Sequence, residues 1–407
     1  MAGENLVAAI DFGTTKIVVL VGEADADGRM YVIGHGESPS EGLRKGVVVD
    51  MEKLVAAIRK AVTDAQMVSG CEIDRLTVGI SGEHIRSISS HGVVGVNRAD
   101  KEITSNDVLR AIEHSRGVAL PVDREIIHVI PQVFTVDDQG NIKDPVGMTG
   151  SRLEVQSHIV TASVTTAQNL YRALERCHLD VEHLVLESVA LSQVLFTPAE
   201  VGSGIVLLDI GGDLTNVSVF TEGSIRHTAS ISLGGRNVTN DLAIGLRTPV
   251  DQAETLKLTH GAARASIVDP EEMIVVPGIA GRTPREVSRN VLATIIEPRM
   301  EEIFSLVAKE LRSSGVGGVI TGGIMLTGGG SLLPGTVDLA ESIFDLPARL
   351  GQIHGIEHIP DELNSNRYAT VHGLLAWGFT NEPSDGPRGG GFKRAMKKIE
   401  HWITRKL

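Results

Sequence analysis

Aromatic residues make up only 3% of this 407-residue chain. A core of this size must therefore be built mainly from Val, Ile, Leu and Ala, as in α/β proteins with parallel sheets. The two cysteines, Cys71 and Cys177, have no paired spacing, which excludes a disulfide framework or a zinc ribbon. Basic residues are outnumbered 38 to 51 by acidic ones, and the net charge of −13 disfavours a general nucleic-acid binder.

Several common motifs and segments are also missing. Neither G-x-x-x-x-G-K-[ST] nor G-x-G-x-x-G occurs, so the P-loop and dinucleotide fingerprints are absent. Residues 1–10 carry no basic and apolar leader, so we expect no signal peptide. The uncharged stretch 313–337 contains nine glycines and Pro334, which do not suit a spanning helix of about 20 apolar residues. An H-x-x-E-H string at 354–358 is flanked by Gly and Pro, so we expect a surface loop there, not a metal-binding helix.

What the chain does contain is an internal repetition. Residues 7–22 (VAAIDFGTTKIVVLVG) and 206–220 (VLLDIGGDLTNVSVF) each have an apolar strand, an Asp, a Gly- and Thr-containing turn and a second apolar strand. Glycine lets backbone amides approach phosphate oxygens, and Asp can hold Mg²⁺ directly or through water. Two such hairpins, about half the chain apart, predict a duplicated domain that holds one polyphosphate between its halves.

Periodicity predicts α/β elements around these hairpins. Residues 84–161 differ in texture: a Thr104–Asp107 capping box precedes a short helix, and two extended runs follow it. This segment is predicted to be a small α+β subdomain inserted in the first half. The other predicted helices and strands are these: helices over 50–67, 166–176, 189–195, 236–245, 250–260, 285–312 and 368–379, strands over 75–81 and 183–186, and a strand, a Gly turn and a helix start over 322–333.

The strings AIDFGTTK, LDIGGDLTN, QAETLKLTHG and LTGGGSLLPG resemble the nucleotide site of the actin/Hsp70/hexokinase superfamily. Within it, REIIHVIPQVF, IKDPVGMTGSRLEV, VTNDLAIGL and IIEPRMEEIF resemble the FtsA family of bacterial cell-division proteins. The resemblance implies an α/β fold of duplicated actin-like (ribonuclease H-like) domains around a nucleotide cleft, with an inserted α+β subdomain and a C-terminal amphipathic helix. The implied domains are a first actin-like domain of residues 1–83, 162–195 and 361–380, an insert of 84–161, a second actin-like domain of 196–360, a linker of 381–391 and a helix of 392–407.

The resemblance also assigns residues to ATP and Mg²⁺. Asp11 and Asp209 would face Mg²⁺, partly through water. The other nucleotide-binding residues that it implies are Gly13, Thr14, Thr15 and Lys16 on one side of the phosphates, Gly211, Gly212 and Asp213 on the other, and Gly234, Gly235, Glu254, Lys257, Gly328, Gly329, Gly330 and Ser331 around the nucleoside.

The second hairpin departs from the superfamily pattern D-I-G-G-G-T-x-D. Asp213 replaces a Gly, Leu214 a hydroxyl residue and Asn216 an Asp. A carboxylate at 213 would repel the γ-phosphate unless Mg²⁺ or Lys16 neutralises it. Glu187 is a candidate for positioning the attacking water, although a surface acid is an equal interpretation. We therefore expect ATP binding with slow or absent hydrolysis.

The resemblance further implies filament formation and attachment of the tubulin-like protein FtsZ to the cytoplasmic face of the cell membrane at the septum, together with other division proteins. Arg299 and Glu302 match the region that takes the FtsZ tail, although a solvated ion pair is an equal interpretation. A pilus-assembly actin homologue and a small-molecule kinase of the superfamily are the alternatives.

The C-terminal residues 392–407 predict a helix on the membrane surface. Six cations and one acid accompany an apolar stripe with three- and four-residue spacing. The segment is too short and too charged to span, and binding to its own protein or to a calmodulin-like partner is the alternative. The stripe consists of Phe392, Met396, Ile399, Trp402, Ile403 and Leu407.

Overall fold

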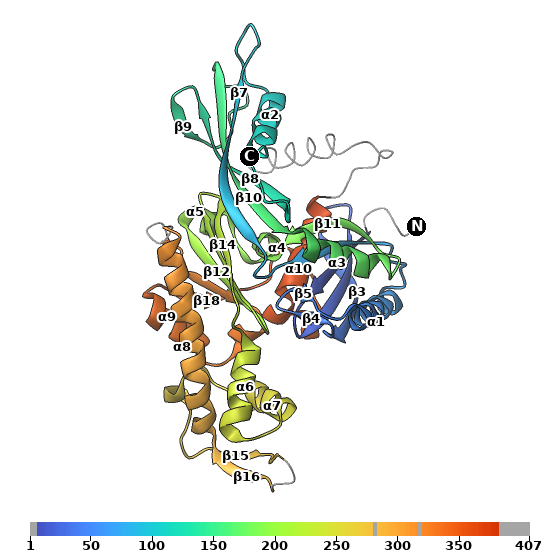
Figure 1. Cartoon of the computed structure of the whole chain (residues 1–407), viewed down its shortest axis with the longest axis vertical. Helices are drawn as coiled ribbons and strands as arrows, with labels where there is room; N and C mark the ends of the chain where they lie inside the picture. Colours follow the sequence, from blue (N-terminus) through green and yellow to red (C-terminus); the bar gives the residue numbers. More distant parts are fainter. Residues whose placement is uncertain (1–5, 280–282, 316–319, 382–407) are drawn as a thin grey trace.

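The computed structural model describes residues 6–279, 283–315 and 320–381. Figure 1 shows two α/β halves side by side, with a third, smaller sheet projecting from one end. The predicted linker of 381–391, beyond its first residue, and the predicted helix of 392–407 lie outside the described residues.

The first half is built on a six-stranded sheet in the order β11-β6-β1-β2-β3-β19. Side chains alternate along β1, so that Ile10 faces a core shared with α1, whereas Val7 and Ala9 face a core shared with α10. The sheet is therefore covered by helices on both faces. Its elements are β1 (Leu6–Phe12), β2 (Lys16–Ala24), β3 (Met30–Pro39), β6 (Arg75–Ile80), β11 (Asp180–Leu186), β19 (Ile356–Glu357), the hairpin β4 (Leu43–Arg44) and β5 (Val47–Val48), α1 (Met51–Ser69), α3 (Val164–Glu175), α4 (Glu187–Leu195) and α10 (Ala369–Thr380).

The second half repeats this topology. Its sheet has the order β14-β13-β12-β17-β18, in which three antiparallel strands are followed by two parallel ones. The strands β3-β2-β1-β6-β11 of the first half have the same arrangement. The internal repetition in the sequence is thus a duplicated fold. Its elements are α5 (Pro198–Ser203), β12 (Ile205–Ile210), β13 (Thr215–Thr221), β14 (Ser224–Ile231), α6 (Gly235–Leu246), α7 (Val250–His260), β15 (Met273–Val276), β16 (Arg285–Ser288), α8 (Arg289–Ser313), β17 (Ile324–Thr327), the 3₁₀ turn η3 (Gly329–Leu332), α9 (Thr336–Phe344) and β18 (Ala348–Leu350).

One apolar cluster joins the two halves. Ile205, Leu207 and Phe220 of the second sheet belong to the same buried cluster as Ile10 and Leu195 of the first half. Since burying apolar surface is the main stabilising term in folding, this shared cluster ties the halves into one body.

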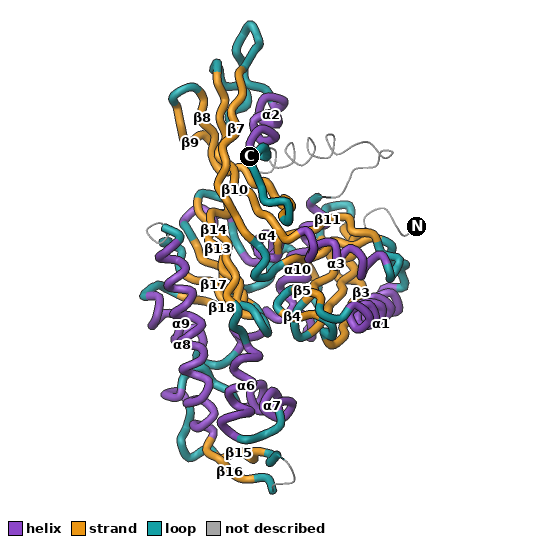
Figure 2. Tube along the Cα trace, in the orientation of Figure 1, coloured by secondary structure: helices purple, strands orange, loops and turns teal. Residues whose placement is uncertain are grey.

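The inserted sheet has the order β7-β10-β8-β9 and carries α2 on one face. The predicted capping box is present: the Asp107 carboxylate accepts hydrogen bonds from the backbone N–H of Thr104 (3.0 Å) and from its hydroxyl (2.7 Å). Figure 2 shows the long strands of this sheet running away from the two halves. Its elements are β7 (Arg86–Gly95), α2 (Ser105–Ser115), β8 (Arg124–Val136), β9 (Gln139–Ile142) and β10 (Arg152–Ser163).

The prediction of a single helix over residues 285–312 is wrong at its start. Arg285–Ser288 pairs with Met273–Val276 as a hairpin, and only then does α8 begin, with the Ser288 hydroxyl accepting from the Asn290 N–H (3.2 Å). The helix start predicted within 322–333 is also only a 3₁₀ turn, since Pro334 follows it and α9 begins at Thr336. The fold class, with its insert, is confirmed for the described part of the chain. None of the helices described is both long and apolar enough to cross a bilayer.

Candidate functional site

The two hairpins face each other where the halves meet. The first loop, residues 13–15, connects β1 to β2, and the second loop, residues 211–214, connects β12 to β13. A Cβ atom placed on Gly212 would lie only 2.6 Å from Cγ2 of Thr15, so the loops are in direct contact. The turn residues predicted to hold phosphates from opposite sides are therefore brought together.

Three buried carboxylates lie below these loops. Burial and the negative charge of Asp209 raise the pKa of Asp11 to about 7, although Lys16 partly offsets them. Burial raises the pKa of Asp209 to about 6, opposed by a hydrogen bond from Asn216 (3.3 Å). Burial, Asp11 and Asp209 raise the pKa of Glu187 well above its ordinary value. Glu187 is thus a buried member of the cleft and not a surface acid.

An excess of buried negative charge of this kind suits a cation. No three His, Cys, Asp or Glu side chains in the described residues converge closely enough to enclose a metal ion. Mg²⁺, however, is usually held by one or two carboxylates together with waters and phosphate oxygens. Asp11 and Asp209 fit that donor set.

Lys16 is oriented by residues that the sequence did not single out. Its ammonium lies 3.2 Å from the Glu37 carboxylate and 3.1 Å from the centroid of the Tyr368 ring. The Tyr368 hydroxyl donates to the same Glu37 carboxylate (2.9 Å). Burial lowers the pKa of Lys16 to about 8, against the attraction of Glu37. The sequence does not predict this cluster, because Tyr368 lies far from Lys16 in the chain, after the second half.

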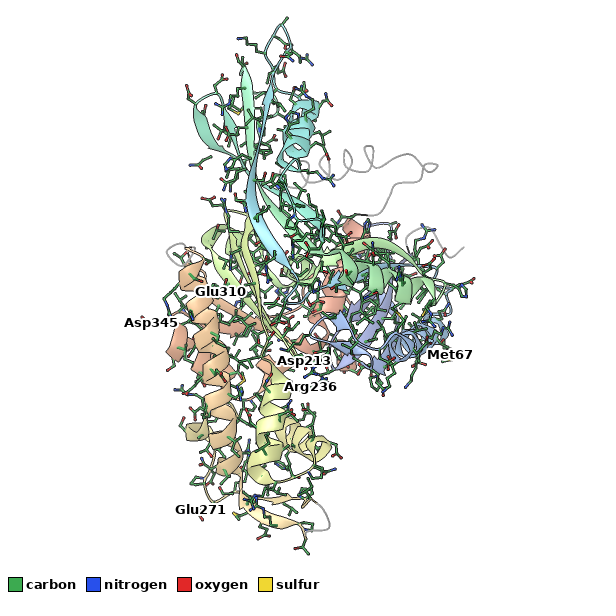
Figure 3. The ribbon with its side chains drawn as sticks, in the orientation of Figure 1. Met67, Asp213, Arg236, Glu271, Glu310 and Asp345 are labelled. Carbon is green, nitrogen blue, oxygen red and sulfur yellow. The ribbon has the colours of Figure 1, made fainter. Side chains whose placement is uncertain are left out.

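Asp213 is neutralised by Arg236 and not by Lys16. The buried Asp213 carboxylate accepts from the Arg236 guanidinium, with 3.2 Å between Nη1 and Oδ1, and from the backbone N–H of Lys45 (3.3 Å). In Figure 3 the two labelled side chains lie together where α6 meets the first half. The sequence did not single out Arg236. Its position directly after the predicted Gly234–Gly235 pair could have indicated a cation close to the phosphates.

The start of α6 packs tightly on the second loop. The backbone amides of Gly235 and Arg236 donate to the carbonyls of Gly211 (2.9 Å) and Gly212 (2.7 Å). A Cβ on Gly234 would lie 2.6 Å from both carbonyl oxygens, so only glycine fits. In this structure these glycines serve close packing, and direct contact with a phosphate stays a prediction.

Glu254 and Lys257 lie on one face of α7, as their spacing predicts. Their side chains form an ion pair of 2.7 Å, and the Lys257 ammonium also donates to the Gly235 carbonyl (3.1 Å) and the Thr239 hydroxyl (2.9 Å). Burial lowers the pKa of this lysine, opposed by Glu254. The pair therefore connects α7 to the start of α6 beside the second loop.

The glycine run after β17 borders Asp209. Gly328 has φ of +81°, and a Cβ there would lie 2.4 Å from a carboxylate oxygen of Asp209. Gly330 packs equally closely against Ile210, whereas a Cβ on Gly329 would meet only Cγ of Arg367 at 3.7 Å. The buried Ser331 hydroxyl donates to the Gly328 carbonyl (2.7 Å). Of the run, Gly329 alone has space for a side chain.

Arg299 and Glu302 lie on α8 and contact each other, but Arg299 also pairs with Asp241 of α6 at 2.6 Å. Asp241 raises the pKa of this arginine. The sequence did not single out Asp241. Any acidic partner that used Arg299 would have to compete with it.

Two copies of one α/β unit that face each other across a cleft with paired Asp-x-Gly loops define an actin-like protein. Solved structures agree: the chain is similar to one from a PilM-PilN type IV pilus biogenesis complex, with a TM-score of 0.66, 14% identity and coverage of 93% of this chain and 99% of that one. It is also similar to MreB5 of Spiroplasma citri bound to ADP, with a TM-score of 0.58, 14% identity and coverage of 97% and 98%.

Sequence comparison is more specific, and the chain belongs to the FtsA family of cell-division proteins. It is 43% identical to the FtsA protein of Pseudomonas aeruginosa over 94% of this chain and 91% of that one. It is 35% identical to that of Escherichia coli K12 over 98% and 96%. The model of the cell division protein FtsA matches residues 206–373, and that of the SHS2 domain inserted in FtsA matches residues 82–161.

Proposed function

We propose that this protein binds Mg-ATP in the cleft, polymerises at the cytoplasmic face of the cell membrane and anchors FtsZ there at the division septum. Family membership and the paired loops above Asp11 and Asp209 support this proposal. The observation that carries the nucleotide part is the pair of buried carboxylates, Asp11 and Asp209, beside two loops in contact, since such carboxylates can hold the Mg²⁺ that neutralises the phosphates. MreB5, which shares the fold, is bound to ADP in its structure.

In this proposal Mg²⁺ offsets the charge of the triphosphate. Lys16, held by Glu37 and Tyr368, contributes a positive charge near the phosphates, and the amides of the two loops bind phosphate oxygens. Glu187 holds a proton or a water in the cleft. Because Asp213 adds a carboxylate and Asn216 replaces an acid, we propose slow turnover at most.

Nucleotide binding is tested by a thermal shift with Mg-ATP. Ligand at about 100 times its dissociation constant contributes roughly 2.7 kcal/mol of stability, so the melting temperature should rise by several degrees. Gly329→Trp should abolish the rise while the protein still folds, because of the three glycines 328–330 only this one has space for a side chain. A matched control is Gly202→Trp, which adds the same side chain away from the two loops at a glycine with open space around it. An unchanged melting temperature of the unsubstituted protein would refute the nucleotide site.

Membrane attachment is proposed for residues 392–407, which lie outside the described residues. The segment carries six Lys or Arg and one Glu, and each cation near an anionic surface contributes about 1 kcal/mol. Trp402→Glu should release the protein from vesicles of anionic lipid in a flotation assay without changing the ATP-dependent thermal shift. Val122→Glu, which adds the same charge at a fully exposed apolar side chain of the described fold, is the control. Flotation of Trp402→Glu with the vesicles would contradict the anchor.

FtsZ binding is proposed for α8 around Arg299 and Glu302. A synthetic FtsZ C-terminal tail should bind the intact protein and bind Arg299→Glu at least about tenfold more weakly, as expected for the loss of a charge-assisted contact. Arg312→Glu, which reverses an exposed charge at the end of the same helix, is the control. If Arg299→Glu binds the tail as tightly as the unsubstituted protein does, Arg299 is not part of the partner surface.

The pilus-assembly alternative rests on a likeness of 14% identity, which supports a shared fold alone. A small-molecule kinase would transfer phosphate to sugars or acetate, and a coupled assay for ADP with those substrates distinguishes it from the division protein.

A further inference from the structure

Position 213 carries a buried carboxylate where the superfamily pattern has glycine. Its side chain is only 8% exposed and lies between the halves. One contact comes from Arg236 of its own half and another from the backbone N–H of Lys45 in the first half (3.3 Å). Glycine could make neither contact, so both are particular to this chain's departure from the pattern.

Arg236 completes a bridge across the cleft. Its Nη1 pairs with Asp213, and its Nη2 donates to the backbone carbonyl of Thr14 in the first loop (2.8 Å). Because Arg236 is the second residue of α6, whose start is fixed on the second loop, its position is set by packing. One guanidinium thus contacts both loops at once.

The two loops also form a hydrogen bond with each other. The backbone N–H of Asp213 donates to the Thr14 hydroxyl (3.1 Å). A peptide N–H, a threonine hydroxyl and a guanidinium are the groups that bind phosphate oxygens in proteins. Here each of them is engaged by a group of the opposite loop, so a phosphate that enters between the loops must replace those contacts.

We propose that Asp213 and Arg236 form a cross-cleft clamp that competes with the phosphates of a nucleoside triphosphate. The inference rests on the proposed function, namely that this cleft binds ATP. When the phosphates enter, Arg236 exchanges the Thr14 carbonyl for a phosphate oxygen, whereas the Asp213 carboxylate opposes the incoming negative charge. Arg236 therefore raises the affinity for the triphosphate, and Asp213 lowers it.

The two residues predict opposite changes in calorimetric Mg-ATP binding. Asp213→Asn keeps the shape of the side chain and removes its charge, so ATP should bind about five- to tenfold more tightly. Arg236→Gln should weaken binding about tenfold or more, since a charged donor to phosphate is lost. Asp251→Asn and Arg312→Gln remove the same charges at exposed positions and should change neither value.

The double variant separates two roles of Arg236. If Arg236 contacts phosphate, Arg236→Gln weakens ATP binding in the Asp213→Asn background as well. If Arg236 only neutralises Asp213, it has no effect in that background, and the exchange onto phosphate is overturned. Weaker or unchanged binding by Asp213→Asn alone would overturn the competition.

A second measurement needs no nucleotide. The Lys45 N–H donates to the Asp213 carboxylate, so Asp213→Gly should speed hydrogen exchange in the peptide around Lys45, and Asp251→Asn should leave it unchanged. Equal exchange in these two variants would show that the clamp is not formed. Absence of ATP binding by the unsubstituted protein would instead refute the proposed function, so the two failures are distinguishable.

Discussion

Individual buried side chains give this protein two opposing responses to acid. Burial lowers the pKa of His84, His158 and His372 to about 4, from an ordinary value of 6.5. The carboxyls of Asp11 and Asp209 have raised pKa values. Between about pH 4 and 6.5 the unfolded chain binds protons at the histidines that the folded protein does not, whereas at the carboxyls the folded protein holds the extra protons. As the pH falls, the histidines therefore lower the stability of the folded protein, whereas the two carboxyls raise it.

His372 allows the histidine effect to be isolated. It is fully buried in α10, where Nε2 donates to the Leu363 carbonyl (3.2 Å). Its contribution should be complete above pH 6.5 and should decrease by up to about 1.4 kcal/mol per pH unit as the pH falls toward 4. His372→Gln should therefore flatten the decline of the unfolding free energy on acidification, measured by urea titration at pH 7 and pH 5. His354→Gln, near the surface, is the control, and identical slopes for the two variants would contradict the prediction.

At the residue scale, the structure brings together Asp11, Asp209 and the turn glycines, which the family pattern singles out in the sequence. The sequence could not predict Glu37 and Tyr368 beside Lys16, or Arg236 beside Asp213, because long-range side-chain contacts follow from tertiary packing. Local spacing carries no signal for them. The roles of these residues toward a nucleotide stay predictions.

Among the secondary-structure elements, those with local signals were predicted closely. The helix predicted over 250–260 is α7 within its exact bounds, and that over 50–67 is α1 with Asp50 as its cap. The strand Arg285–Ser288 was missed because pairing with Met273–Val276 decides its conformation, and a helical period in the following residues masks it. Long-range pairing thus overrides the local pattern.

The capping box of α2 allows a stability prediction for a single helix. Asp107 accepts from both donors of Thr104 and also pairs with Arg110 (3.0 Å). Asp107→Ala should lower the unfolding free energy by about 1–2 kcal/mol, because it removes the partner of a helix-start N–H. Hydrogen exchange should quicken across α2. Asp107→Asn keeps an acceptor oxygen and should lose less, and an equal loss in both variants would show that charge matters more than capping.

At the scale of the whole molecule, the inserted sheet is connected to both halves. Val160 and Ala162 of β10 belong to the buried cluster of the first half. Gln132 of β8 connects the sheet to the second half: its amide donates to the Ile225 carbonyl (2.7 Å) and accepts from Arg226 (2.8 Å). Excision of residues 84–161 would therefore open the core as well as remove a surface.

Gln132→Leu should separate these roles. It removes the amide partner of the Ile225 carbonyl, which costs about 1–3 kcal/mol, while Arg226 keeps its ion pair with Glu222. We expect a lower unfolding free energy and faster hydrogen exchange in β14, with α2 unaffected. Gln156→Leu is the matched control, since among the described residues the Gln156 amide donates to Ser89 (3.2 Å), within the inserted sheet. Unchanged exchange in β14 would mean that the bond to Ile225 does not hold the two parts together.

The strand β8 has one further consequence, which is mechanical. Its 13 residues span roughly 44 Å at about 3.4 Å each. Near one end, His128 Nε2 accepts from the backbone N–H of Leu186 (2.9 Å), the residue just before Glu187. The strand β8, paired with β10 along its length, thus connects the far end of the inserted sheet to the residue next to a buried carboxylate. We expect a force applied at the far end of this sheet to be transmitted along both strands toward Leu186.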